Sequence, residues 1–214
     1  MNTLYRSALL VTLLGLCATA QAEWSANLGW ASEYHFRGIF QHASSASGGV
    51  DFERGGFYAG TWAADVGDGL EVDGYFGYGG EVDDFGYGIG YTGYFYTGDF
   101  DDTYQEINLG GSYGLLSVDV AVGKYDNFSG PTVDYTYYAI TLENNGFYGK
   151  FGGFSQDATG EYLEVGYGTT ISEIDLGLSL ILANSDLIGD INGDDIPDDD
   201  ASLIFTIGKS FDLQ

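Results

Sequence analysis

Short stretches in which apolar and polar residues alternate recur along this chain, and this period of two constrains its fold more than any other feature. In residues 70–78, Leu70, Val72 and Phe76 share one face, whereas Glu71 and Asp73 lie on the other. Successive side chains of a β-strand point to opposite faces, so the pattern predicts strands with one apolar face. A soluble sandwich buries that face, whereas a membrane barrel turns it outward against lipid and keeps polar groups in the lumen. The choice between these architectures decides which functions are open to the chain.

Alternation of this kind predicts twelve strands, most of them close to the roughly 9–11 residues that a tilted strand needs to cross a bilayer. The segments are 24–37, 49–53, 57–65, 70–78, 85–97, 104–113, 115–125, 132–142, 146–155, 161–170, 173–184 and 202–212.

The first 22 residues have the pattern of a secretory signal peptide. Arg6 precedes an apolar stretch over residues 8–18, and Ala20-Gln21-Ala22 fits the small-x-small cleavage rule. We expect cleavage after Ala22, which leaves residues 23–214 as one barrel domain. The one cysteine, Cys17, lies inside the signal segment, so a disulfide framework is not expected in the mature chain.

The charge balance excludes several classes of partner. The chain has 6 Lys and Arg against 32 Asp and Glu, for a net charge of −26. Loss of the signal segment removes one cation and no acid, which makes the net charge −27. Nucleic acid and anionic surfaces are poor partners for such a chain. Disorder is disfavoured by the 16% aromatic content and the two prolines.

The predicted connections favour a membrane barrel over a soluble β-protein. Those after odd-numbered strands include the longest, at 38–48 and 185–201, and most of the acidic clusters. Those after even-numbered strands are mostly tight, as at 54–56 and 143–145, although 79–84 is longer. Short turns on one side and long loops on the other are typical of outer-membrane barrels. The expected fold is therefore an all-β, antiparallel, up-and-down transmembrane β-barrel of about 12 strands, with a secreted soluble β-protein as the alternative.

Many of the 35 glycines fall on the inward phase of these strands, for example Gly86, Gly88, Gly90, Gly123 and Gly152. Glycine weakens an ordinary strand, so its frequency needs a reason. Small inward residues would leave room in a narrow lumen for Tyr, Asp and Glu side chains from neighbouring strands.

Residues 32–41, Ser-Glu-Tyr-His-Phe-Arg-Gly-Ile-Phe-Gln, resemble the signature S-[DE]-Y-x-[FW]-R-G-[IV]-x-Q. This signature begins a group of proteobacterial exported proteins known as the Gcw_chp domain or TorF family porins. Residues 49–52 and 56–63 are similar to the next block of that family. The resemblance is sharp over residues 24–66 and diffuse beyond. It implies an outer-membrane barrel.

Charged residues on the inward phase are the candidate lumen and selectivity residues. Glu33, His35 and Arg37 share this phase in the first strand, and Arg37 is one of only five cations expected in the mature chain. One interpretation is that Arg37 neutralises Glu33 and other lumen acids, because an unpaired buried charge is costly. The other is a constriction that sets solute selectivity. Further inward acids are Glu71, Asp73 and Asp119.

Residues 190–198 contain the one metal-like motif. Asp190, Asn192, Asp194 and Asp198 occupy alternate positions and resemble calcium loops, although Asp195 stands where those loops have glycine. Oxygen ligands at such a spacing can wrap a hard cation, so weak calcium binding is one expectation and a solvated acidic loop the other. No other cofactor is expected.

Catalytic motifs are weak in this sequence. The two histidines, His35 and His42, and the loop serines Ser44, Ser45 and Ser47 show no specific nucleophile–base spacing. We therefore predict no enzyme but a porin-like channel in outer-membrane lipid of a bacterium, passing small solutes or cations. The alternatives are a non-conducting structural or adhesive barrel that works through its acidic loops, and a lipid-modifying enzyme with a site at the rim.

Overall fold

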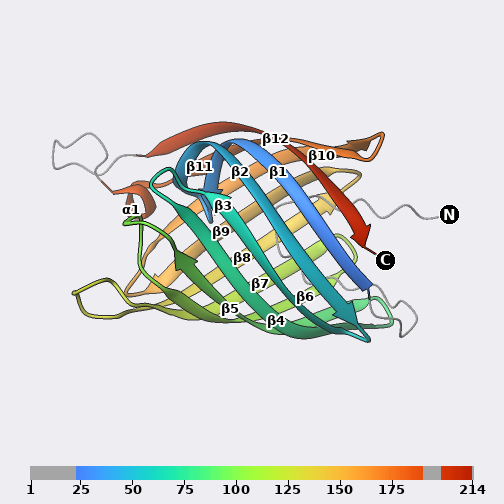
Figure 1. The fold of residues 1–214 in the computed structure, drawn as a ribbon, viewed down its shortest axis with the longest axis horizontal. Helices are drawn as coiled ribbons and strands as arrows, with labels where there is room; N and C mark the ends of the chain where they lie inside the picture. Colours follow the sequence, from blue (N-terminus) through green and yellow to red (C-terminus); the bar gives the residue numbers. More distant parts are fainter. Residues whose placement is uncertain (1–22, 190–198, 214) are drawn as a thin grey trace.

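The computed structural model of the chain describes residues 23–189 and 199–213, which form a closed antiparallel β-barrel (Figure 1). Each strand pairs with the next along the chain, and β1 pairs with β12 to close the sheet. This confirms the predicted fold. The strands are β1 (Glu23–Phe36), β2 (Ile39–Arg54), β3 (Phe57–Asp65), β4 (Leu70–Val82), β5 (Phe85–Tyr96), β6 (Tyr104–Tyr113), β7 (Leu116–Tyr125), β8 (Val133–Asn144), β9 (Phe147–Gln156), β10 (Gly160–Ile171), β11 (Ile174–Ala183) and β12 (Asp200–Leu213).

In the part of the chain that the structure describes, one short helix, α1 (Ser185–Ile188), lies between β11 and β12. The side chain of its N-cap, Asn184, accepts a hydrogen bond from the Leu187 backbone N–H. Within the described residues, no helix has the length and apolar character needed to cross a membrane.

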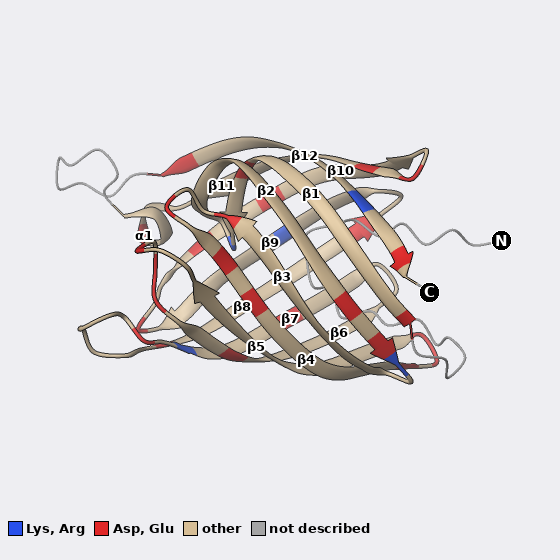
Figure 2. Cartoon of the chain, viewed as in Figure 1, with Lys and Arg blue, Asp and Glu red and all other residues tan. Residues whose placement is uncertain are grey.

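The two faces of the barrel wall differ in chemistry, as the alternation predicts. On β4, Phe76 is 53% exposed on the outside, whereas Glu71 is 1% and Asp73 8% exposed on the inside. The alternation of exposed and buried residues continues in other strands, for example in β5 and β10. Acidic residues lie along the strands as well as near the ends of the barrel (Figure 2). Large apolar side chains exposed on the outer surface include Leu28, Phe95, Ile107, Val122, Ile140, Leu163, Leu178 and Phe205.

The connections after even-numbered strands are all two-residue turns, at 55–56, 83–84, 114–115, 145–146 and 172–173. Asn145 and Gly146 both have positive φ, at 53° and 83°, as the turn that matches strand twist requires. The connection that we expected over residues 79–84 consists of residues 83–84 alone, because β4 continues to Val82.

The first connection corrects the sequence prediction. Residues 38–48 are not a long loop, because β2 begins at Ile39 and the turn is Arg37-Gly38 alone. Beyond Ala31, β1 no longer pairs with β12, and before Ser47, β2 no longer pairs with β3. Residues 32–46 therefore form a two-stranded hairpin that leaves the barrel wall. The first half of this hairpin agrees with the predicted strand 24–37, whereas its second half, residues 39–46, was predicted as part of a loop.

This segment, 32–46, is called the inner hairpin below. Its turn contacts strands on the other side of the barrel. Arg37 bonds Glu106 on β6, and the Gly38 backbone lies against the Tyr162 ring on β10. Three strands separate β2 from β6, and two separate β1 from β10 in the order around the barrel. The inner hairpin consequently crosses the lumen.

Inward glycines make room for tyrosine rings, as expected. A Cβ built on Gly123 would meet the Tyr135 ring, and one on Gly152 would lie 2.7 Å from the Tyr162 ring. The tyrosines thus lie flat across neighbouring strands inside the barrel, where they line the candidate site.

Candidate functional site in the lumen

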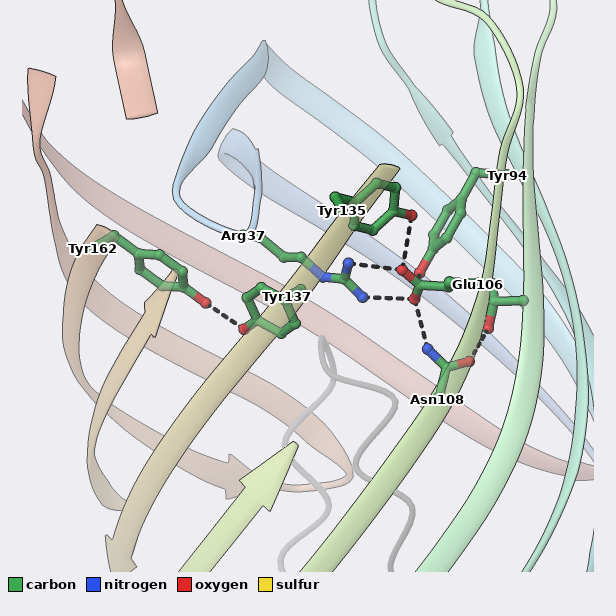
Figure 3. A network of polar contacts seen from close by, with 8 residues as sticks. Arg37, Tyr94, Glu106, Asn108, Tyr135, Tyr137 and Tyr162 are labelled. Carbon is green, nitrogen blue, oxygen red and sulfur yellow. Dashed lines mark hydrogen bonds and ion pairs between the residues drawn. The ribbon is translucent and has the colours of Figure 1, made fainter. Parts of the chain in front are cut away.

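The turn of the inner hairpin presents Arg37 to a carboxylate on the opposite wall (Figure 3). Arg37 Nη2 and Nη1 donate to Glu106 Oε1 and Oε2 at 2.6 and 2.8 Å. The side chain of Glu106 is 0% exposed and that of Arg37 13%. A bidentate pair of this kind combines charge with fixed geometry, and it is only slightly screened here because both groups are buried.

Glu106 also receives three hydrogen bonds from the wall itself. Tyr94 donates its hydroxyl at 2.8 Å, Tyr135 at 3.0 Å and the Asn108 amide at 2.6 Å. Asn108 in turn accepts from the Thr92 hydroxyl at 2.9 Å. The carboxylate is therefore held in one orientation by β5, β6 and β8.

Aromatic rings enclose the guanidinium. Its central carbon lies 4.0 Å from the centroid of the Tyr137 ring and 4.8 Å from that of Phe36. Tyr137 is fixed by a 2.8 Å hydrogen bond to Tyr162. Cations over such faces are attracted by the ring quadrupole. We call the group Tyr94, Glu106, Asn108, Tyr135 and Tyr137 the guanidinium socket.

Gly38 allows the turn to approach this wall. Its φ is +87°, and an added Cβ would lie 2.7 Å from the Tyr162 ring. Arg37 itself has φ 51°, so both turn residues are in the left-handed region. The Arg-Gly of the sequence signature is thus explained by a two-residue hairpin turn and by a close contact inside the barrel.

A second group of buried acids lies on β4, beside the inner hairpin. Glu71 accepts hydroxyl hydrogen bonds from Tyr34 at 2.5 Å and Tyr96 at 3.0 Å. Asp73, two residues along, is 8% exposed, and its Oδ1 has no hydrogen-bond partner among the described residues. An unpaired buried carboxylate oxygen is costly unless water or a cation reaches it.

The structure brings only some of the predicted lumen residues into contact with one another. Glu33 pairs with His35 at 3.2 Å on the flank of the inner hairpin, and not with Arg37. The pairing of Arg37 with Glu33 is therefore wrong: Arg37 sits in the turn and points across the lumen to Glu106. Glu71 and Asp73 are buried on the inner wall, and Asp119 is half-buried on β7.

Sequence reasoning missed three important inward residues, Glu106, Lys150 and Glu164. Glu106 and Lys150 are 2% and 3% exposed, and Lys150 lies 4.0 Å from Glu164. The signal was present, because Glu106 precedes the outward Ile107 and Lys150 precedes the outward Phe151. The alternation that identified Glu71 would have found them as well.

No group of three His, Cys, Asp or Glu side chains within residues 23–189 and 199–213 is arranged to hold a metal ion. The proposed calcium ligands Asp190, Asn192, Asp194 and Asp198 lie outside the described residues.

Several solved structures are similar to this chain, at 10–15% sequence identity. One, from a study of the in-meso crystallization of membrane proteins, has a TM-score of 0.56 at 10% identity, covering 89% of this chain and 84% of that one. The NanC porin gives 0.48 at 15% identity, covering 89% and 100%. OccK1 (OpdK) of Pseudomonas aeruginosa gives 0.41 at 13%, covering 80% of this chain but 57% of its own. The first of these, with a TM-score above 0.5 at 10% identity, supports the fold alone.

A comparison with curated proteins finds no match. A family model described as "Bacterial protein of unknown function (Gcw_chp)" matches residues 17–194, which include the inner hairpin and the socket strands. The chain therefore belongs to the Gcw_chp family of bacterial proteins.

Proposed function

We propose that this protein is a porin-like channel of the bacterial outer membrane that passes small solutes or cations. The observation that carries the proposal is a closed barrel with an apolar outer face and a lumen lined by carboxylates and tyrosine hydroxyls. A wall of this kind suits lipid outside and polar solutes inside.

A cation preference follows from the charges that face the lumen. Glu71, Asp73 and Asp119 face inward, whereas Arg37 and Lys150, the inward cations among residues 23–189 and 199–213, each have an acidic partner. Rings or clusters of acid in a narrow pore favour cations over anions. The inner hairpin narrows the same lumen, so we expect a small conductance.

A non-conducting barrel is the second candidate. It is favoured by one observation, the inner hairpin that crosses the lumen and is tied to the far wall. Under this hypothesis the barrel serves as a scaffold for its acidic loops.

Export to the outer membrane requires removal of the signal segment. We expect the mature chain to begin at Glu23, which intact-mass measurement of protein from outer-membrane fractions would establish. A water-soluble protein absent from those fractions would contradict the proposal.

Planar-bilayer recordings on residues 23–214 test conduction directly. In a KCl gradient we expect a reversal potential of cationic sign, and a smaller one in Asp73→Asn. Asp84→Asn, which removes the same charge from an exposed turn, is the matched control. A folded barrel that never conducts would favour the scaffold, and anion preference would refute the selectivity.

A further inference from the structure

The guanidinium socket consists only of residues of the barrel wall, and Arg37, which occupies it, comes from the inner hairpin. Its members lie on β5, β6 and β8, where continuous pairing from β4 through β9 fixes the backbone. The bonds from Tyr94, Asn108 and Tyr135 orient the Glu106 carboxylate independently of Arg37. The socket is consequently a preformed receptor in the wall.

The residue that occupies the socket is carried by the inner hairpin, which is held to the wall by side-chain contacts and not by strand pairing. On its side, Tyr34 donates to Glu71 on β4 at 2.5 Å and packs beside Ala64 and Val66. The inner hairpin pairs with itself and leaves both neighbouring strands. At its base, Ser32 Oγ accepts from the Phe205 backbone N–H at 2.9 Å, and Ser45 Oγ donates to the Asp65 carbonyl at 2.7 Å. The strand pairing that closes the barrel therefore does not involve the inner hairpin or the contact of Arg37 with the socket.

The socket selects a particular chemical group. Both Glu106 oxygens are engaged by the two terminal nitrogens of one planar fork, which lies over the Tyr137 ring. An ammonium is a point charge, so it cannot make the parallel pair of hydrogen bonds and also stack flat on the ring.

We propose that the guanidinium socket is a recognition site for solutes that carry a guanidinium group, and that Arg37 occupies it as a tethered internal ligand. Such a solute competes with Arg37, frees the turn of the inner hairpin and thereby widens the lumen. The binding step stands without conduction, whereas the widening rests on the proposed channel function.

Competition sets the concentrations to be used. A short tether gives Arg37 an effective concentration on the order of millimolar, so free guanidinium binds the wild-type chain only when it exceeds this level. Removal of Arg37 removes the competitor and exposes the intrinsic affinity.

Arg37→Asn is the variant of choice, because Asn-Gly suits the turn that Arg37 and Gly38 form and the barrel should fold. Methylguanidinium and methylammonium chlorides are titrated at constant ionic strength into the detergent-folded barrel, with binding followed by calorimetry. We expect Arg37→Asn to bind methylguanidinium about tenfold more tightly than methylammonium, a difference of about 1.4 kcal/mol.

Two further variants complete the binding test. Arg37→Asn combined with Glu106→Gln should lose the preference. Lys124→Asn removes a cation from an exposed pair with Asp134 and should behave as wild type. Equal affinity for the two probes in Arg37→Asn, or an undiminished preference in the double variant, would overturn the proposal.

A labelling experiment follows the hairpin in a chain that retains Arg37. The mature chain is expected to contain no other cysteine, so Ile39→Cys places one thiol beside the turn. Methylguanidinium should accelerate its modification, and methylammonium should not. A rate unaffected by methylguanidinium at tens of millimolar would refute release of the hairpin even if the channel conducts. Release without conduction would instead refute only the channel.

Discussion

Glu106→Gln tests how strongly the far wall holds the inner hairpin. The substitution keeps the shape of the side chain and removes the charge that faces Arg37. Two of the five hydrogen bonds at this carboxylate come from Arg37, at 2.6 and 2.8 Å. Bonds to charged groups contribute about 1.5–3 kcal/mol each, and removing one partner of a buried pair costs roughly 3–5 kcal/mol. The hairpin can move out and rehydrate Arg37, so we expect a loss near the lower value, about 3 kcal/mol.

Urea unfolding of the barrel in detergent micelles, followed by tryptophan fluorescence, measures this loss. Arg37→Asn and the double variant complete a double-mutant cycle. We expect the sum of the stability losses of the two single variants to exceed the loss of the double variant by more than about 1 kcal/mol. Asp134→Asn breaks the exposed ion pair between Asp134 and Lys124, in which the Asp134 side chain is 51% exposed and the Lys124 side chain 68%. This substitution should cost at most about 1 kcal/mol of stability. Additivity within about 0.5 kcal/mol would show that Arg37 and Glu106 do not stabilise each other.

Three other predictions concern different parts of the chain. Gly77→Ala should destabilise the barrel by about 1–3 kcal/mol in urea unfolding, because the added Cβ would meet the Tyr58 hydroxyl and the Ile89 carbonyl. Gly74→Ala, on the same strand, adds a Cβ that meets nothing within 4 Å and should leave the stability unchanged. Equal losses would contradict the packing argument. The unboiled barrel should migrate differently from the boiled chain in SDS gels, and a single band position would argue against a stable barrel. Calcium at millimolar concentration should protect residues 186–200 from proteolysis, and Asp194→Ala should abolish that protection; equal cleavage with calcium and with chelator would leave only a solvated acidic loop.

The amino-acid sequence by itself determined the wall of this barrel. Each strand between lipid and lumen must alternate, so residues such as Leu70, Glu71, Val72 and Asp73 reveal their environment locally. Two-residue turns are similarly local, because Asn145-Gly146 specifies its own geometry. The acids of β4 could therefore be assigned to the lumen from their positions in the alternating pattern alone.

Only the tertiary structure decided what crosses the lumen. Residues 32–37 alternate like the wall strands, but residues 39–46 do not, because this part of β2 leaves the wall and no longer lies between lipid and lumen. The partner of Arg37 is 69 positions away, on a wall that comes opposite the turn only when β1 closes onto β12. Local periodicity could identify Arg37 and the phase of Glu106 separately, but closure of the barrel is what makes them a pair.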